Sequence, residues 1–277
     1  MAVLPKIMVD FELRILPDLE VMMKEFWLKK RFSALTASVV MVAAVAISFL
    51  GWFLPRPEAA PVSGTPVTTR QLYQAAVEDA VEADSGEVMP LVCVTPDDDM
   101  VTWNDAGDKV LMLSWHRYPE SYPNGESITL QYGEVWTFTD KEIKAWYQKN
   151  KDGVKDWNLR LKQLIGLPEE KEYTHFTAFW VSPEDLLRPA YQTDITKDEM
   201  EVSWPENGDV DFKEWFDGNI VWSYFDSAYP WTRLGYTYDW ADNGTDYGLT
   251  EFIIQNGAPV DIEFTYTNEE FLNWLAA

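Results

Sequence analysis

The longest apolar run of the chain lies near its beginning, from Phe32 to Leu54. These 23 residues contain no charged side chain and no proline. At 1.5 Å per residue, a helix of this length extends about 34 Å, enough to cross a hydrocarbon core of about 30 Å. Pro55 and Pro57 follow and end the predicted helix. A cleaved signal peptide is the alternative, but its apolar core is ordinarily about 7–15 residues long. We therefore predict one transmembrane helix at 32–54.

Positive charge around this run predicts its orientation. Lys29, Lys30 and Arg31 precede it directly, whereas Arg56 is the only basic residue close behind it. The positive-inside rule then places the N-terminus in the cytoplasm and the large C-terminal part outside. Within residues 1–31, leucines recur at helical spacing, which predicts a cytoplasmic amphipathic segment.

The remaining chain divides into a Pro-rich linker at 55–67 and an extracytoplasmic domain at 68–277. In the domain, segments with helical periodicity are grouped between runs of segments with strand periodicity, which predicts an α+β fold with a mainly antiparallel sheet and helices. We expect helices at 69–83, 140–149, 154–165 and 268–277 and a short helical turn at 182–185. We expect strands at 89–95, 109–118, 127–132, 134–138, 173–181, 212–216, 220–225, 235–240, 249–254 and 260–267.

Two local motifs support these boundaries. A Thr three residues before a Glu or Gln is a capping box, which marks a helix start. Capping boxes are expected at Thr68 with Gln71, Thr139 with Glu142, and Thr267 with Glu270. Glycine-containing turns predict hairpins around Gly133, at 217–219 and at 256–257.

Composition restricts the function. The chain has 22 Lys and Arg against 46 Asp and Glu, a net charge of −24, so nucleic acid is excluded as a partner. A single Cys excludes an intramolecular disulfide framework. Residues 55–277 alone carry a net charge of −25. Solubility, a cationic partner, and repulsion from an anionic bilayer are the three explanations for this charge.

His116 and His175 are the candidate catalytic residues, because histidine transfers protons near neutral pH. Either one, beside a carboxylate, would serve a hydrolase. No Gly-X-Ser-X-Gly sequence accompanies them. The alternative is that both are structural residues held by hydrogen bonds.

Two acidic segments offer possible ligands for calcium, the run Asp97–Asp99 and a polar turn near residue 240. Asp239, Asp242, Asn243 and Asp246 provide oxygen side chains of the kind that calcium prefers. Their spacing is not that of an EF-hand, and a plain polar loop is the alternative. No other cofactor is expected.

Aromatic residues and rare cations in the last third of the chain are the candidate binding residues. Exposed Trp and Tyr stack on sugars or serve as hot spots for proteins, and an isolated Arg either pairs with a carboxylate or gathers an anionic ligand. The candidates are Arg188, Arg233, Trp231, Tyr236, Tyr238 and Trp240.

Several distinctive runs carry a resemblance. They are 160–168, 179–181, 188–191, 229–240 and 248–252. Together they are similar to patterns in uncharacterised bacterial proteins of unknown function, over roughly residues 100–265. The resemblance implies a bacterial origin and no particular activity.

These observations predict a single-pass protein of the bacterial inner membrane. Its acidic, Trp-rich external domain is expected to bind a protein partner or a polymer of the cell envelope, such as a glycan. An extracytoplasmic hydrolase with a His–carboxylate pair is one alternative. An accessory subunit of a membrane protein complex is another.

Overall fold

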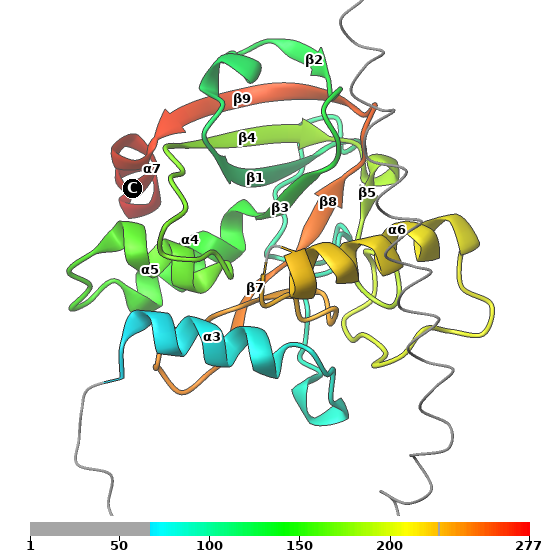
Figure 1. Ribbon diagram of the computed structural model, residues 1–277. Coiled ribbons are helices and arrows are strands. Elements are labelled where there is room, and N and C mark those ends of the chain that lie inside the picture. Colours follow the sequence, from blue (N-terminus) through cyan, green and yellow to red (C-terminus); the bar gives the residue numbers. More distant parts are fainter. Residues whose placement is uncertain (1–66, 227) are drawn as a thin grey trace, which may run out of the picture. The chain divides into compact units, whose positions relative to one another are not determined.

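The computed structural model describes residues 67–226 and 228–277 (Figure 1). The α-helices are α3 (Thr69–Asp79), α4 (Asp140–Asn150), α5 (Trp157–Leu164), α6 (Val210–Val221) and α7 (Asn268–Ala276). The strands are β1 (Val110–His116), β2 (Ser127–Thr129), β3 (Val135–Thr139), β4 (His175–Val181), β5 (Leu186–Leu187), β6 (Tyr236–Tyr238), β7 (Tyr247–Thr250), β8 (Phe252–Ile254) and β9 (Pro259–Thr267). Short 3₁₀ turns occupy Ser85–Glu87, Pro119–Ser121 and Pro183–Asp185, and a π-helical turn, Trp222–Asp226, extends α6.

The predicted transmembrane helix at 32–54 lies outside these residues, as do the cytoplasmic segment and most of the linker. Within the described part of the chain, no helix has the length and apolar character needed to cross a membrane.

Seven strands form one sheet in the order β2-β9-β4-β1-β3-β8-β5, and β6 pairs with β7 in a second, smaller sheet. Every pairing between these strands is antiparallel. The predicted α+β class with a mainly antiparallel sheet is therefore confirmed.

The large sheet buries both of its faces. On β1, Val110 and Met112 join one core, which also holds residues of β4, β8 and β9. Leu111 and Leu113 point the other way, because successive strand side chains alternate between faces. They join a second core that α4, α5 and α7 cover (Figure 1).

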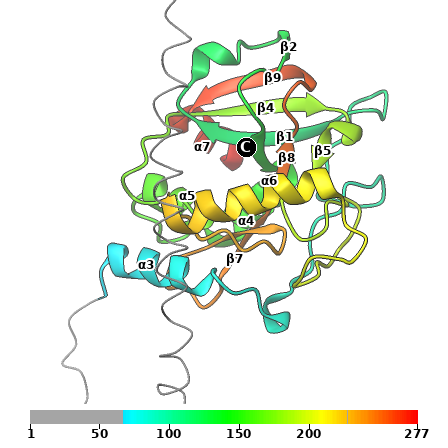
Figure 2. The ribbon, with the colours of Figure 1, turned by 45° about the vertical axis from the view of Figure 1, so that its right-hand side comes forward.

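Helix α6 covers a different part of the sheet. Its Phe212 and Phe216 pack on Trp136 of β3 and Ile253 of β8. Figure 2 shows α6 lying across the front of the sheet, near β8 and β5. Helix α3 instead packs on the small sheet, where its Ala76 contacts the region of Tyr238.

Local signals located several elements correctly. The capping boxes of Thr68 with Gln71 and of Thr267 with Glu270 both form, and they start α3 and α7. Both boxes need only contacts between residues three apart, so the sequence contains all the information that they require. The helical turn with proline in its first position also forms, at Pro183–Asp185.

The third predicted capping box does not form. Helix α4 begins after Thr139, but the Thr139 side chain makes no capping hydrogen bond. Glu142 instead accepts hydrogen bonds from the N–H and hydroxyl of Thr250, at 2.9 and 3.0 Å, and from the Tyr247 hydroxyl at 3.0 Å. A distant strand therefore outcompetes the local partner.

Three predicted strands are not strands. Residues 89–95 belong to no strand, but they bond to an irregular segment, through Leu91 N–H to the Asp198 carbonyl and Val94 N–H to the Ile195 carbonyl. The predicted strands at 212–216 and 220–225, and the hairpin turn at 217–219 between them, are α6 and its π-helical turn. The spacing of Phe212 and Phe216 is helical, and burial of these rings against the sheet decides the element.

The predicted hairpin around Gly133 is also wrong. The strand before it, β2, pairs with β9, and the strand after it, β3, pairs with β1 and β8. The turn at 256–257 is present, but the β8 and β9 strands that it joins do not pair with each other. The predicted strand at 249–254 is divided between the two sheets, as β7 and β8, with Glu251 at the break.

Candidate functional site

The large sheet is split between two of its central strands. β1 pairs with β3 at only two positions, Met112 with Thr139 and Leu113 with Phe138. Beyond Leu113, β1 continues along β4, whereas the first half of β3 runs along β8. The two strands therefore diverge, and their edges form a wedge.

A cavity of about 1150 Å³ occupies this wedge. Three consecutive residues of β1, Ser114–His116, and four of β3, Val135–Phe138, line it. Because consecutive strand residues point to opposite faces, a cavity that touches all of them lies at the strand edges, in the plane of the sheet. Its volume exceeds the roughly 300–1,000 Å³ of ordinary small-molecule sites.

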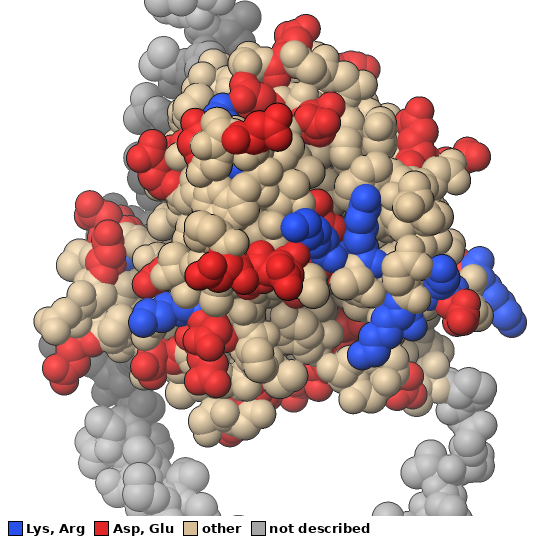
Figure 3. Space-filling view, turned by 180° about the vertical axis from the view of Figure 1, so that it is seen from behind, with Lys and Arg blue, Asp and Glu red and all other residues tan. Residues whose placement is uncertain are grey.

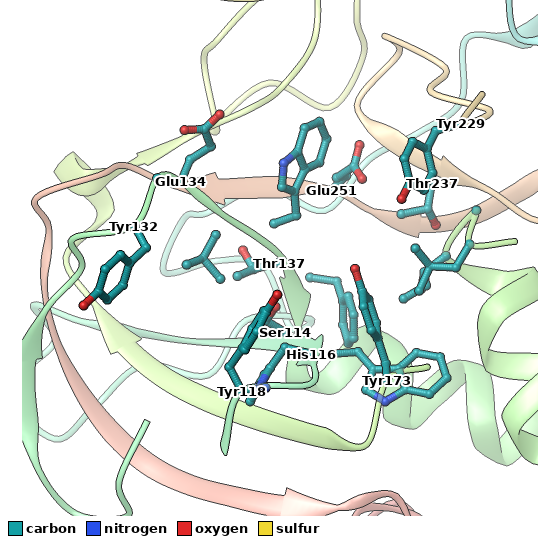
Figure 4. A pocket seen from close by; sticks show the side chains of 18 of the residues that line it. Ser114, His116, Tyr118, Tyr132, Glu134, Thr137, Tyr173, Tyr229, Thr237 and Glu251 are labelled. Carbon is teal, nitrogen blue, oxygen red and sulfur yellow. The ribbon is translucent and has the colours of Figure 1, made fainter. Parts of the chain in front are cut away.

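Aromatic rings and hydroxyl groups dominate the cavity walls (Figure 4). Ser114, His116 and Tyr118 lie on one side of the view, and Glu251, Tyr229 and Thr237 lie across from them. Among the described residues that line the cavity, none is Lys or Arg. An anionic ligand would therefore find no countercharge on the cavity walls.

Exposed aromatic side chains surround the mouth. Tyr132 is 94% exposed, Trp222 is 63% exposed and Tyr118 is 54% exposed, and all three line the cavity. Aromatic rings gathered on one cavity present apolar surface to a ligand, and Trp and Tyr are enriched among the residues that dominate binding energy.

Glu251 is the most unusual group in the cavity. Its position is fixed where the chain leaves β7 for β8, with its backbone N–H bonded to the Gly235 carbonyl at 2.9 Å. Its carboxyl group makes no hydrogen bond to any described residue, and burial raises its pKa to about 8. The carboxyl is therefore mainly neutral at pH 7 and can donate a hydrogen bond to a ligand.

The two predicted catalytic histidines do meet, because His116 on β1 lies opposite His175 on β4. The His175 ring is bonded to the adjacent Thr174 hydroxyl at 2.8 Å. Burial, assisted by the nearby His175, lowers the pKa of His116 to about 4. His116 is therefore neutral at physiological pH.

A chain of hydrogen bonds also fixes the tautomer of His116. The Thr265 hydroxyl donates to the Tyr122 carbonyl, so it must accept from the Thr177 hydroxyl, 2.7 Å away. The Thr177 hydroxyl then accepts from His116 Nε2–H at 2.7 Å. On the other side of the ring, Nδ1 accepts from the Tyr118 backbone N–H at 3.0 Å. Both ring nitrogens are engaged, and neither contacts a carboxylate.

Two of the predicted binding residues are structural. Arg188 is fully buried and donates to the carbonyls of Val92, Ile195 and Lys197 at 3.0–3.1 Å. Arg233 donates to the carbonyls of Ala80 and Val81 and to the Tyr191 hydroxyl. Neither arginine lines the cavity, so each one joins loops rather than binding an anionic ligand there.

The predicted aromatic binding residues divide. Trp231, Tyr236 and Tyr238 line the cavity, whereas Trp240 packs under α3 and donates to the Leu167 carbonyl at 3.0 Å. The sequence analysis did not single out Glu251. One signal was available, because this carboxylate interrupts the apolar run at 249–254.

The predicted calcium ligands do not converge. Asp239 is buried, and its Oδ1 accepts from Arg160 Nη1 at 3.0 Å while its Oδ2 accepts from Arg160 Nη2. The Asn243 amide also donates to Asp239 at 3.0 Å, and Asp242 is exposed. Nowhere in the described ranges do three or more His, Cys, Asp or Glu side chains gather in a group that could hold a metal ion. The geometry therefore gives the calcium prediction no support.

No protein-family model matches the chain, and comparisons with curated proteins and with solved structures find no match.

Proposed function

We propose that the domain at 68–277 is a binding module that holds a chain-like ligand in the wedge cavity. One observation carries this proposal. A large open cavity, lined by rings, hydroxyls and an unpaired carboxyl group, has three exposed aromatic side chains at its mouth. Such rings supply most of the energy in recognition surfaces, and unpaired polar groups give the site its specificity.

The hydrolase alternative has less support. Its base would be His116, but both nitrogens of that ring are already hydrogen-bonded and its low pKa opposes proton uptake. His175 does not line the cavity. Binding therefore explains the arrangement better than acid–base chemistry does.

The proposal includes the setting that the sequence predicts. A helix at 32–54 anchors the chain in the bacterial inner membrane, residues 1–31 lie in the cytoplasm, and the linker presents the acidic domain outside. Protease added to intact spheroplasts should then remove the domain and leave a membrane-bound N-terminal fragment. Protection of the domain from this protease would contradict the orientation.

The binding role is tested on the full-length chain purified in mild detergent. Proteins and envelope polymers that it retains are compared between the unaltered chain and the double variant Y132A/W222A. We expect at least a tenfold loss of retained ligand, because both rings lie at the mouth.

Val210→Ala is the matched control. Val210 is 79% exposed at the start of α6 and does not line the cavity, so its truncation should leave retention unchanged. Equal retention by all three proteins would reject the cavity as the binding site. Partners retained only through residues 1–54 would favour the accessory-subunit alternative.

A further inference from the structure

The backbone of β1 leaves hydrogen-bonding groups unpaired inside the wedge. The His116 carbonyl accepts from Thr174 N–H on the β4 side, and Leu111 N–H donates to the Thr102 carbonyl on the opposite side. The backbone N–H and C=O of successive strand residues point alternately to the two sides of the strand. Those of Leu113 therefore point away from β4, as those of Leu111 do, and toward Phe138 of β3. Trp115 is the next residue with this orientation. No backbone group in the described residues bonds to it from that side.

β3 presents the matching edge. Leu113 and Phe138 are directly opposite and face each other, so Phe138 points its backbone groups toward β1. Trp136, two residues earlier, points the same way into the wedge, and it too has no backbone partner there among the described residues. Two strand edges with free N–H and C=O groups therefore line one cavity, and both residues belong to its walls.

We propose that the wedge cavity binds an extended peptide segment of a protein partner, which adds a strand between β1 and β3. This inference rests on the proposed binding function and names its ligand class. Unpaired strand edges are templates for an extended chain, because peptide N–H and C=O groups recur at the spacing that they require. The hydroxyls of a glycan do not reproduce that alternation of donors and acceptors.

The side chains on the two faces of the wedge also predict which residue types the bound peptide carries. The side chains of Ser114 and Thr137 lie on one face of the large sheet. The Trp136 ring lies on the other face, where it packs in the aromatic cluster under α6. The bound segment should therefore alternate small polar residues with large apolar ones. Glu120 and Glu134 line the cavity, and none of its described lining residues is Lys or Arg, so acidic peptide side chains should be disfavoured.

The probe is a phage-displayed library of random nonapeptides, selected on the full-length protein in mild detergent. We expect alternating sequences that lack Asp and Glu. A synthetic peptide of the selected sequence should bind at least tenfold more tightly than the same peptide with one central amide replaced by an ester, because the ester lacks the N–H donor. Equal binding of the two would overturn the inference.

Hydrogen exchange of the native protein gives an independent reading that requires no substitution. Addition of the selected peptide should slow amide exchange at Trp115 and Trp136 at least tenfold. Leu113 and Phe138, which already face each other, are the internal controls and should change little. Unchanged exchange at both Trp115 and Trp136 would also overturn the inference.

A parallel arm separates this inference from the proposed function. A mixture of neutral β-linked oligosaccharides is tested against the unaltered chain and Y132A/W222A. If oligosaccharides bind through these rings and no peptide does, the peptide inference is wrong and the binding function stands. If neither class of probe depends on Tyr132 and Trp222, both are wrong.

Discussion

At the scale of single residues, the charged side chains that are removed from water differ in whether they have a partner of opposite charge. Arg188 is enclosed by carbonyls, and burial lowers its pKa to about 10. Glu251 has no cation beside it, so its carboxyl becomes neutral rather than paired. Asp239 is the contrasting case, because Arg160 neutralises it directly. Each of these states follows from the surroundings of the side chain rather than from its identity.

The first residue-level prediction concerns Glu251 and pH. Its pKa is raised from 4.5 to about 8 in the folded protein, so its contribution to stability is complete below about pH 4.5 and is lost as the pH rises toward 8. Glu251→Gln should therefore remove this loss. The variant should be more stable than the unaltered chain at pH 8, by on the order of 2–4 kcal/mol, and similar to it at pH 4.5.

Denaturant unfolding at several pH values measures this difference. Glu126→Gln, on an exposed turn before β2, is the control and should follow the unaltered chain at every pH. A constant difference between Glu251→Gln and the unaltered chain across this range would show that ionisation of Glu251 does not affect the stability of the fold.

The second residue-level prediction concerns Asp239. Asp239→Asn leaves Arg160 partly buried without its countercharge and should destabilise the fold by about 3 kcal/mol. Thermal unfolding with and without calcium tests this role. Because Asp239 is paired with Arg160, we expect the same loss in both conditions. A calcium-dependent rise in the melting temperature of the unaltered chain, absent from Asp239→Asn, would identify Asp239 as a ligand instead.

At the scale of elements, long-range hydrogen bonds override local patterns. Glu142 on α4 accepts from the backbone and side chain of Thr250 on β7, and so joins a helix to the small sheet. The same carboxylate was expected to cap its own helix at Thr139. The small sheet forms one side of the wedge cavity, through Tyr236 and Thr237, so this contact helps to position the cavity wall.

Two substitutions at the start of α4 distinguish the contact of Glu142 with Thr250 from a capping box between Thr139 and Glu142. Glu142→Ala removes the acceptor of a buried N–H and should destabilise the fold by about 2–3 kcal/mol. Thr139→Val removes a buried hydroxyl that has no hydrogen-bond partner, and it should be neutral or slightly stabilising. Urea unfolding measures both. Equal losses of about 1 kcal/mol would instead indicate a working capping box.

At the scale of the whole molecule, negative charge exceeds positive charge strongly. Lys and Arg gather on one side of the face shown in Figure 3, whereas Asp and Glu spread over the remainder. Two lysines of α4 make contacts within the domain, because Lys141 donates to the Val101 carbonyl and Lys144 lies over the Trp274 ring at 3.8 Å. Mutual repulsion between carboxylates therefore acts on most of the surface.

This repulsion predicts a response to salt. Raising NaCl from 10 to 300 mM shortens the screening length to below 10 Å and should stabilise the fold by about 1 kcal/mol, which raises the melting temperature by about 2–4 °C. Calorimetry of the full-length chain in detergent measures the shift. A melting temperature that falls with salt would show that favourable ion pairs, such as Arg160 with Asp239, outweigh the repulsion.

Local sequence patterns are sufficient to predict the α+β class, the starts of α3 and α7, and the approximate positions of β1, β4 and β9. Those features depend on side-chain periodicity or on caps between residues three apart, as at Thr267 and Glu270. The aromatic helix α6 differs, because its local pattern favours strands and only the packing of its rings on β3 and β8 makes the segment helical.

The pairing of the strands, and the site that this pairing creates, depend on contacts that form only in the folded chain. The split between β1 and β3 depends on the pairing of β3 with β8, where Thr137 lies opposite Phe252. Glu251 lies across the cavity from Ser114 and His116. In both cases the residues are more than 100 positions apart in the chain. The hydrophobic pattern indicates which face of a strand is buried, but it does not identify the distant strand that becomes its neighbour. For this reason the sequence named Trp231, Tyr236 and Tyr238, but only the fold shows that they share a cavity with a neutral carboxyl group and two unpaired strand edges.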